Sequence, residues 1–294
     1  MPKISVMINT RDEEKNLKRC LESVRQLADE IIVVDMYSED KTVQIAKKLG
    51  AKVFFYKYMF YMEPARNFAI SKTSGDWILI VDADEEIPPS LAKLIKNLSK
   101  NHKGLTYFRL PRKNIIFGKW LKHSRWWPDY NIRFFKKGCV RWSEKIHSVP
   151  LTRGTGHDLE AKEANAIIHY HYQSVSQYLE RMNRYTSIQA EELIETGYKF
   201  KWQDMLRKPM GEFLSRFFVG EAYKDGLRGL VLALLQAFSE MVKYIKVWEK
   251  EKFVEQDIST YHEVLEENIN DYLHWQVKAS GLIGKIRLKI KKKI

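Results

Sequence analysis

The chain has 294 residues, of which 45% are hydrophobic, and a formal net charge of +13 at pH 7. This length fits one large domain or a domain with an appendage, and the absence of an apolar run of about 18 residues excludes an evident transmembrane helix. The excess of Lys and Arg indicates an anionic partner, which would be a phosphate-bearing substrate, a nucleic acid or an acidic membrane surface.

The first predicted element is a β-strand at residues 3–9, which follows Met1 and Pro2 directly and leaves no room for a secretory signal. A helix at residues 14–27 comes next, and Cys20 lies on its apolar face. Cys20 and the second cysteine, Cys139, are therefore predicted to be free thiols in a reducing compartment. We expect a cytoplasmic protein.

Strands and helices then alternate through the first hundred residues. Apolar strand patterns cover residues 3–9, 30–35, 52–56 and 76–82. Helical patterns between them cover residues 14–27, 41–49 and 64–71. This order predicts an α/β fold with a doubly wound, mostly parallel sheet and right-handed crossovers. The glycine-rich fingerprints of dinucleotide-binding and P-loop proteins do not occur, which favours a metal ion as the means of binding phosphate.

The pattern changes after residue 104. Further strands are predicted at residues 104–113, 130–137 and 164–172. Helices are predicted at residues 175–196, about 211–248 and about 257–278. We therefore expect a catalytic domain of residues 1–173 and a helical extension of residues 174–294.

Two aspartates, Asp82 and Asp84, come directly after the fourth predicted strand. Residues two apart on a strand point the same way, so the two carboxylates can converge at the end of the sheet where α/β proteins bind ligands. Hard oxygen donors suit Mg²⁺ or Mn²⁺ carrying a diphosphate. The alternative is an acidic surface turn, because this short spacing also occurs by chance.

Four polar segments fall on this same rim of the sheet. They are NTRDEE at residues 9–14, VDMYSEDKT at 34–42, PARN at 64–67 and DAD at 82–84. Their order resembles family 2 glycosyltransferases of the GT-A fold, which show a T-x-N-E-like turn, V-V-D-x-x-S-x-D-x-T, an R-N or K-N pair and then D-x-D. The resemblance covers roughly residues 1–190, and the helical pattern beyond is also similar.

Downstream motifs resemble the subgroup that builds lipopolysaccharide cores. That subgroup shows W-x-P-D-Y, R-L-F and V-H-E, and this chain shows WPDY at residues 127–130, RFF at 133–135 and then His147. Ser148 stands where the subgroup has glutamate. Trp127 is predicted to stack on an acceptor sugar, with packing in the core as the alternative. Arg133 is predicted to meet a phosphorylated or lipid-linked acceptor, with a solvated charge as the alternative.

The resemblance also implies roles for residues in the donor site. Asp35 would accept hydrogen bonds from the nucleotide base or ribose, with helix capping as the alternative. Thr10, Asp12 and Glu13 would line the base pocket, or cap the first helix. Asp82 would contact the nucleotide-sugar donor and would also bind the metal ion.

Arg66, by the same resemblance, would neutralise the diphosphate, or it would be a solvated helix residue. Asp82 and Asp84 would hold the metal, Asp84 more directly. His147 would be a third metal ligand, with a satisfied core histidine as the alternative. His169 and His171 are placed to reach a metal together, although a mixed sheet face is favoured.

The reaction implied is an inverting displacement at the anomeric carbon of a nucleotide-diphosphate sugar. A carboxylate would deprotonate the acceptor hydroxyl. Because the expected glutamate is missing, Asp129 and Glu144 are the candidate catalytic bases.

Two segments of the C-terminal third point to a membrane. Residues 227–238 are very apolar but too short to cross a bilayer, so they predict either a buried packing helix or one lying in the membrane interface. Residues 281–294 alternate apolar and basic residues without any acid, which favours an anionic membrane surface over a solvated tail.

The leading hypothesis is a metal-dependent glycosyltransferase that acts on a glycan or glycolipid acceptor of the cell envelope, peripherally on the inner face of the cytoplasmic membrane. A catalytically silent binding protein is the main alternative. A nucleotidyltransferase would need a glycine-rich loop, and residues 9–14 contain no glycine. We expect no nucleic-acid partner, since no recognition motif is visible.

Overall fold

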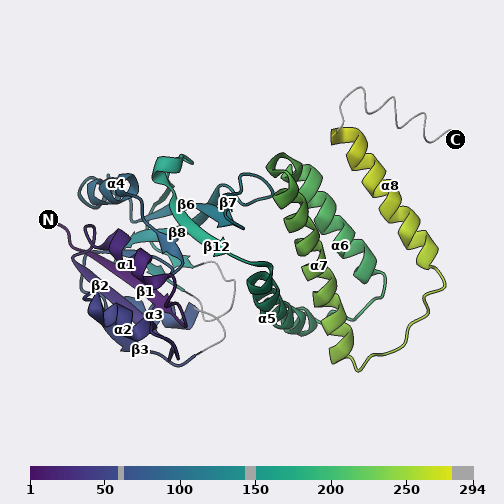
Figure 1. Cartoon of the computed structure of the whole chain (residues 1–294), viewed down its shortest axis with the longest axis horizontal. Coiled ribbons are helices and arrows are strands. Elements are labelled where there is room, and N and C mark those ends of the chain that lie inside the picture. The colour runs from purple at the N-terminus through teal and green to yellow at the C-terminus, as the bar shows by residue number, and fades with distance from the viewer. Residues whose placement is uncertain (59–62, 143–149, 280–294) are drawn as a thin grey trace. The chain divides into compact units, whose positions relative to one another are not determined.

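The computed structural model describes residues 1–58, 63–142 and 150–279 (Figure 1). One unit, built around a sheet, consists of residues 1–116 with 127–171. The other is helical and consists of residues 117–126 with the chain from 172 onward. The domain boundary predicted near residue 173 stays a proposal, and the two units are described separately.

Four parallel strands form one half of the sheet in the first unit, in the order β3–β2–β1–β4. They are β1 (Ile4–Thr10), β2 (Glu30–Asp35), β3 (Lys52–Phe55) and β4 (Trp77–Ile80). Thr10 is the register partner of Asp35, so the carboxyl ends of β1 and β2 lie side by side. The predicted α/β fold with its mostly parallel sheet is confirmed.

The other half of the sheet continues from β4 in the order β8–β6–β12–β5. These strands are β8 (Asp129–Lys136), β6 (Tyr107–Ile116), β12 (Ile167–Tyr172) and β5 (Glu85–Glu86). The sequence did not predict β5, which follows the two aspartates immediately and pairs antiparallel with β12. This pairing sets His169 opposite Glu85 and brings β12 to the acidic segment.

Smaller strands complete the first unit. β11 (Gly156–Asp158) pairs in parallel with β6. β9 (Val140–Arg141) and β10 (Leu151–Thr152) form a separate antiparallel pair.

Helices cover both faces of the sheet. They are α1 (Leu17–Val24), α2 (Thr42–Lys48), α3 (Glu63–Lys72) and α4 (Pro89–Lys100), with a 3-10 turn η1 (Glu163–Asn165). One core cluster joins α1 and α4 to the face that carries Val6 and Ile8. A second cluster joins Ala69 of α3 to the opposite face, which carries Met7. Successive residues of β1 thus enter different cores, as strand geometry requires.

The helix α4 was not predicted, since two consecutive prolines, Pro88 and Pro89, usually interrupt a helix. Pro89 is instead the first residue of the helix, where its missing N–H and fixed φ do no harm. Both cysteines are free, as predicted, and Cys20 is buried on α1.

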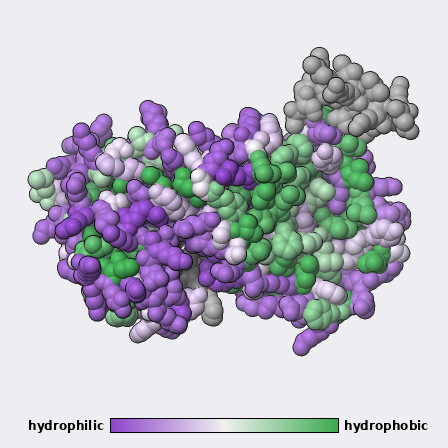
Figure 2. All heavy atoms as spheres, viewed as in Figure 1, coloured by the Kyte–Doolittle hydropathy of each residue, from purple (hydrophilic) through white to green (hydrophobic). Residues whose placement is uncertain are grey.

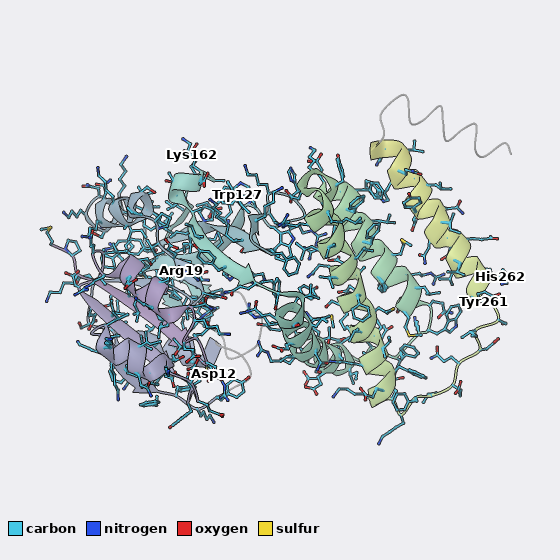
Figure 3. The ribbon with its side chains drawn as sticks, viewed as in Figure 1. Asp12, Arg19, Trp127, Lys162, Tyr261 and His262 are labelled. Carbon is cyan, nitrogen blue, oxygen red and sulfur yellow. The ribbon has the colours of Figure 1, made fainter. Side chains whose placement is uncertain are left out.

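The described part of the second unit contains four α-helices. They are α5 (Val175–Glu195), α6 (Asp204–Leu214), α7 (Leu227–Lys250) and α8 (Tyr261–Ala279), and the short strand β7 (Lys119–Trp120) belongs to the same unit. Tyr261 lies at the beginning of α8 (Figure 3). Among the described helices, none combines the length and the apolarity needed to span a membrane.

The single helix predicted over residues 211–248 is wrong. A π-helical turn η2 (Ser215–Val219) and a 3-10 turn η3 (Ala222–Asp225) separate α6 from α7. Glu221 and Gly226 have φ angles of 57° and 68°, which a right-handed helix cannot contain. Gly229 lets α7 approach η3 closely, since a Cβ there would lie 1.9 Å from the carbonyl oxygen of Ala222.

Candidate active site

The carboxylate of Asp35 joins the ends of β1 and β2. Its Oδ2 accepts hydrogen bonds from Thr10 Oγ1 at 2.9 Å and from Ser38 Oγ at 2.5 Å, and its Oδ1 accepts one from the Ser38 backbone N–H at 2.8 Å. Asp35 is fully buried. A carboxylate has about four acceptor sites, and Thr10 and Ser38 occupy three of those of Asp35. The structure thus brings Thr10 and Asp35 together, and their contact with a nucleotide stays a prediction.

The loop after β1 is hydrogen-bonded to the loop after β2. The Asp12 N–H donates to Ser38 Oγ at 2.9 Å, and Asp12 Oδ1 accepts from the Glu39 N–H at 2.8 Å. The Glu13 N–H donates to Thr42 Oγ1 at 2.8 Å. Asp12 has a φ of 54° and lies on this loop beyond β1 (Figure 3). Asp12 and Glu13 thus lie on the same rim as Asp35, and their contact with a nucleotide base stays a prediction.

Asp82, at the end of β4, is held by two arginines. Its Oδ2 accepts a hydrogen bond from Arg133 Nη2 at 2.5 Å, and its Oδ1 lies 3.5 Å from Arg66 Nη2. Burial alone would raise the pKa of Asp82, but the charges of Arg133 and then Arg66 hold that pKa well below its usual range. Asp82 is therefore ionised, and Arg66 lies at the rim where the sequence placed it.

Asp84 faces a histidine of β12. Its Oδ1 lies 3.6 Å from His169 Nε2, and both side chains are nearly buried. His169 Nδ1 lies 2.7 Å from Asn114 Oδ1, which can only accept, so the proton of a neutral His169 belongs on Nδ1. In that tautomer Nε2 carries a lone pair, which His171 Nδ1 approaches at 3.2 Å. Asp84 Oδ1 and His169 Nε2, two atoms that can bind a metal ion, thus lie together beside the acidic turn.

A chain of polar side chains leads from one aspartate of the turn to the other. The connected residues are, in order, Asp84, His169, Asn114, Asp129, Arg112, Glu85, Arg133 and Asp82. Glu85 is fully buried at its centre, 2.7 Å from Arg133 Nη2 and 3.6 Å from Arg112 Nη1. Burial raises the pKa of Glu85 more than the two arginines lower it. The sequence analysis missed Glu85, Arg112 and Asn114, and only the run of acids after β4 could have drawn attention to the first.

Asp129, a predicted catalytic base, belongs to this series of connected polar side chains. Its Oδ2 accepts from Arg112 Nη2 at 2.6 Å and from Asn114 Nδ2 at 3.1 Å, and its Oδ1 accepts from Asn131 Nδ2 at 3.1 Å. Burial raises the pKa of Asp129, but Arg112 and Asn114 outweigh burial and lower it. A low pKa makes a weak base, so the predicted role would require Arg112 to move.

The other predicted residues are placed as follows. Arg133 is 3% exposed and engaged by Asp82 and Glu85, so its predicted acceptor contact stays a prediction. Trp127 is half-buried two residues before β8. Glu144 and His147 lie outside the described residues.

The donor set fits a divalent ion brought by a substrate. Within the described part of the chain, no three His, Cys, Asp or Glu side chains form a ready-made metal cluster. Mg²⁺, however, is typically held by about one or two carboxylates, with waters and substrate phosphates completing the shell. Asp84 and Asp82 supply such carboxylates, and His169 Nε2 supplies a nitrogen that Mn²⁺ accepts.

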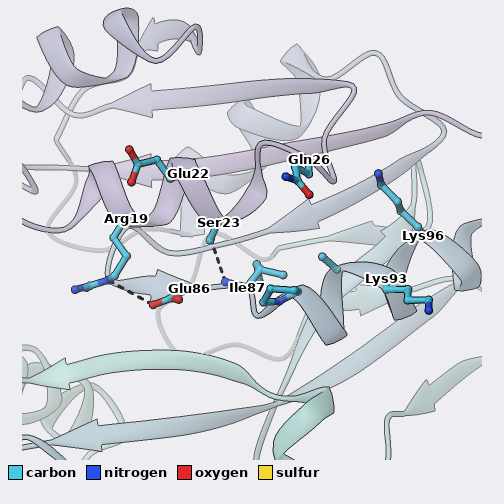
Figure 4. A pocket seen from close by; sticks show the side chains of 10 residues that line it. Arg19, Glu22, Ser23, Gln26, Glu86, Ile87, Lys93 and Lys96 are labelled. Atoms are coloured by element: carbon cyan, nitrogen blue, oxygen red, sulfur yellow. Dashed lines mark hydrogen bonds and ion pairs between the residues drawn. The ribbon is translucent and has the colours of Figure 1, made fainter.

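A separate hollow of about 540 Å³ lies between α1, β5 and α4 (Figure 4). Arg19 lines it, lies 3.9 Å from Glu86, and stacks over the Tyr170 ring at 3.6 Å. Tyr170 OH also donates to Glu86 at 2.9 Å. Glu86 is thus engaged by both Arg19 and Tyr170, and we assign the hollow no ligand.

Polar side chains lie at the carboxyl ends of β1, β2 and β4, which is the edge where open α/β sheets bind their ligands. The family model for Glycosyl transferase family 2 matches residues 5–153, and the chain belongs to this family.

Relatives agree with this assignment. An uncharacterized glycosyltransferase of Rickettsia typhi is 33% identical over 263 residues, which are 85% of this chain and 88% of the relative. The lipopolysaccharide core biosynthesis glycosyltransferase LpsC of Rhizobium meliloti is 23% identical over 84% of this chain and 92% of its own length. Among solved structures, residues 1–349 of S. aureus TarS in complex with UDP give a TM-score of 0.46 at 17% identity, over 83% of this chain and 91% of that one.

Proposed function

We propose that this glycosyltransferase is metal-dependent and inverting, and that it moves a sugar from a nucleotide-diphosphate donor to a lipopolysaccharide core or a related envelope glycan. The observation that carries the proposal is the contact between Asp84 and His169, next to Asp82 beyond β4, at the end of the sheet where Thr10 and Asp35 also lie. LpsC supports the acceptor class.

Each side chain of the rim has a role in the proposed reaction. Asp35, fixed by Thr10 and Ser38, orients the nucleoside through its remaining acceptor site. Asp82, Asp84 and His169 would hold Mg²⁺ or Mn²⁺, and His147 stays a predicted further ligand. The ion supplies Lewis-acid stabilisation of the leaving diphosphate. Arg66, 3.5 Å from Asp82, adds a positive charge beside that diphosphate.

The chemical step is a single displacement. The acceptor hydroxyl oxygen bonds to the anomeric carbon, and the bond from that carbon to the diphosphate oxygen breaks with its electron pair leaving on the diphosphate. A carboxylate takes the proton of the hydroxyl. Asp129 and Glu144 are the two candidates, and the arginine that pairs with Asp129 makes Asp129 a weak base.

The tail at residues 281–294 lies outside the described residues. Its basic, acid-free composition supports contact with an anionic membrane surface, where each basic residue contributes about 1 kcal/mol. We propose that the enzyme works peripherally at the inner face of the cytoplasmic membrane, where a lipid-linked acceptor would be reached.

The test is calorimetric binding of UDP-sugars with and without Mn²⁺. Wild type should bind in a metal-dependent manner, and Asp84→Ala should lose that binding. Asp158→Ala is the matched control, because Asp158 pairs with Arg109 on β6, away from the rim. Equal, metal-independent binding by wild type and Asp84→Ala would instead support a catalytically silent binding protein. Ser148, which stands in place of the expected glutamate, is the sequence feature that favours this alternative.

A further inference from the structure

A buried asparagine of β6, Asn114, contacts the histidine that faces Asp84. In Figure 2 the surface of the unit built around the sheet is mostly hydrophilic, whereas Asn114 is a polar residue of its interior and is 1% exposed. Burying an amide costs free energy unless its N–H and C=O groups are hydrogen-bonded. The partners of Asn114 therefore indicate its role.

Asp129 fixes the orientation of this amide. Asn114 Nδ2 donates a hydrogen bond to Asp129 Oδ2 at 3.1 Å. The same oxygen accepts from Arg112 Nη2 at 2.6 Å, and Arg112 keeps Asp129 ionised. An ionised carboxylate can only accept, so the N–H group of the amide must face it. The amide oxygen, Oδ1, consequently faces His169 on the neighbouring strand β12.

The amide oxygen determines which nitrogen of His169 carries the proton. Asn114 Oδ1 lies 2.7 Å from His169 Nδ1, and this hydrogen bond requires a proton on Nδ1, because Oδ1 has none to give. Asp84 Oδ1 attracts the proton to Nε2 instead, but at 3.6 Å it lies beyond hydrogen-bond range. The closer acceptor therefore holds the proton, and His169 Nε2 keeps its lone pair.

The neighbouring His171 is compatible with the same tautomer. Its Nδ1 lies 3.2 Å from His169 Nε2, so a proton on His171 Nδ1 can bond to the lone pair until an ion takes its place. A histidine that binds a metal usually donates its other ring N–H to a fixed acceptor, which sets both the tautomer and the ring orientation. Asn114, itself held by Asp129, is an acceptor of this kind.

We propose that Asn114 is a positioning residue, which holds His169 in the tautomer whose Nε2 can bind a divalent ion beside Asp84. Without the amide oxygen, Asp84 would be the remaining acceptor in this comparison and would draw the proton to Nε2, where it would block an ion. The role rests on the proposed function, since it serves the reaction only if a divalent ion binds there.

The first test is long-range ¹H–¹⁵N NMR of the histidine rings in the full chain, at alkaline pH and without ion or nucleotide. Wild type should carry the His169 proton on Nδ1, and the signals are assigned by their loss in His169→Ala. Asn114→Leu, which has a similar volume but no acceptor, should move the proton to Nε2. A proton on Nε2 in wild type would overturn the proposal, and this outcome does not depend on the folding of any Asn114 variant.

Two further variants separate positioning from a purely structural role. Asn114→Asp keeps an acceptor oxygen toward His169 and should leave the proton on Nδ1. Asn131→Leu is the matched control, because Asn131 also donates to Asp129 at 3.1 Å, but to the other carboxylate oxygen. It should leave the His169 tautomer unchanged. The proposal fails if folded Asn114→Leu keeps the wild-type tautomer, or if Asn131→Leu alters it to the same extent.

The second test is Mn²⁺ binding in the presence of UDP, followed by electron paramagnetic resonance. Asn114→Leu should weaken binding by about 10-fold or more, and neither Asn114→Asp nor Asn131→Leu should weaken it by more than about threefold. If Mn²⁺ binds equally to wild type and to folded Asn114→Leu, the positioning role is wrong and the proposed function stands. If wild type binds no Mn²⁺, the proposed function is contradicted, and the positioning role with it.

Discussion

His169 Nε2 faces Asp84 Oδ1 at 3.6 Å, although the two residues are far apart in the sequence. The contact exists because β5 pairs with β12 directly after the acidic turn. His169→Ala is expected to weaken Mn²⁺ binding in the presence of UDP by about 10- to 100-fold, because Asp84 loses the neighbouring donor. Electron paramagnetic resonance of free Mn²⁺ measures this.

The control for this variant is His157→Ala, which removes an exposed histidine of β11. Circular dichroism should show that both variants are folded. Unchanged Mn²⁺ affinity in folded His169→Ala would remove His169 from the proposed donor set.

The two candidate bases can be separated by amide substitutions. Glu144→Gln is expected to lower kcat for donor hydrolysis by about 10²-fold or more, as loss of a general base does. Asp129→Asn should cost less, because Arg112 already keeps that carboxylate a weak base. Initial rates at saturating UDP-sugar decide the point, and a larger loss in Asp129→Asn would reverse the assignment.

Glu30 should make folding stability depend on acid pH. Burial raises its pKa, but hydrogen bonds from Ser5, Ser74 and Lys52 outweigh burial and lower the pKa from 4.5 to about 2. Because the pKa of Glu30 is lower in the folded state, the ionised carboxylate stabilises the fold at pH values above the unfolded-state pKa. This stabilisation is lost as the pH falls from about 4.5 to 2. Glu30→Gln should cost about 1–3 kcal/mol at pH 7 and progressively less below pH 4.5.

Urea unfolding of Glu30→Gln from pH 7 to pH 3 measures the effect. Glu22→Gln is the control, since Glu22 is exposed on α1 and pairs only loosely with Lys18 at 3.9 Å. A pH-independent difference between wild type and Glu30→Gln would contradict the prediction.

Alanine substitutions at two glycines of the helical unit should change its stability in opposite directions. Gly229→Ala is expected to destabilise the unit by about 2–3 kcal/mol, because its Cβ would overlap the Ala222 carbonyl oxygen. Gly211→Ala meets nothing within 4 Å and should stabilise α6 by about 0.5–1 kcal/mol. Scanning calorimetry measures both, and equal shifts would show that the close approach of α7 to η3 is not rigid.

The first four strands were predictable because each is a continuous apolar run between helices of clear periodicity. Asp82 and Asp84 could be placed at the rim for the same reason. The network behind them could not, because β5 has only two residues, both glutamates, and is defined by its partner on β12. Glu85 therefore read as surface charge, yet it is buried between Arg112 and Arg133.

In the C-terminal part of the chain, the prediction from sequence failed for a different reason. The helical pattern of residues 211–248 was real, but Glu221 and Gly226, which both have a positive φ, interrupt the helix on either side of η3, and hydrophobic periodicity does not report this. The apolar stretch at residues 227–238 was left between a packing helix and an interfacial one. α7 buries one side, as the packing helix requires, and leaves the other side exposed, so the interfacial alternative stays a prediction.

The arginines behind the acidic turn also bear on how this protein could change over time. Arg66, Arg112 and Arg133 already balance most of the negative charge of Asp82, Glu85 and Asp129, so the fold needs no bound ion to keep these acids from repelling one another. A lineage could thus abandon sugar transfer through one or two substitutions at the rim and still inherit an intact scaffold.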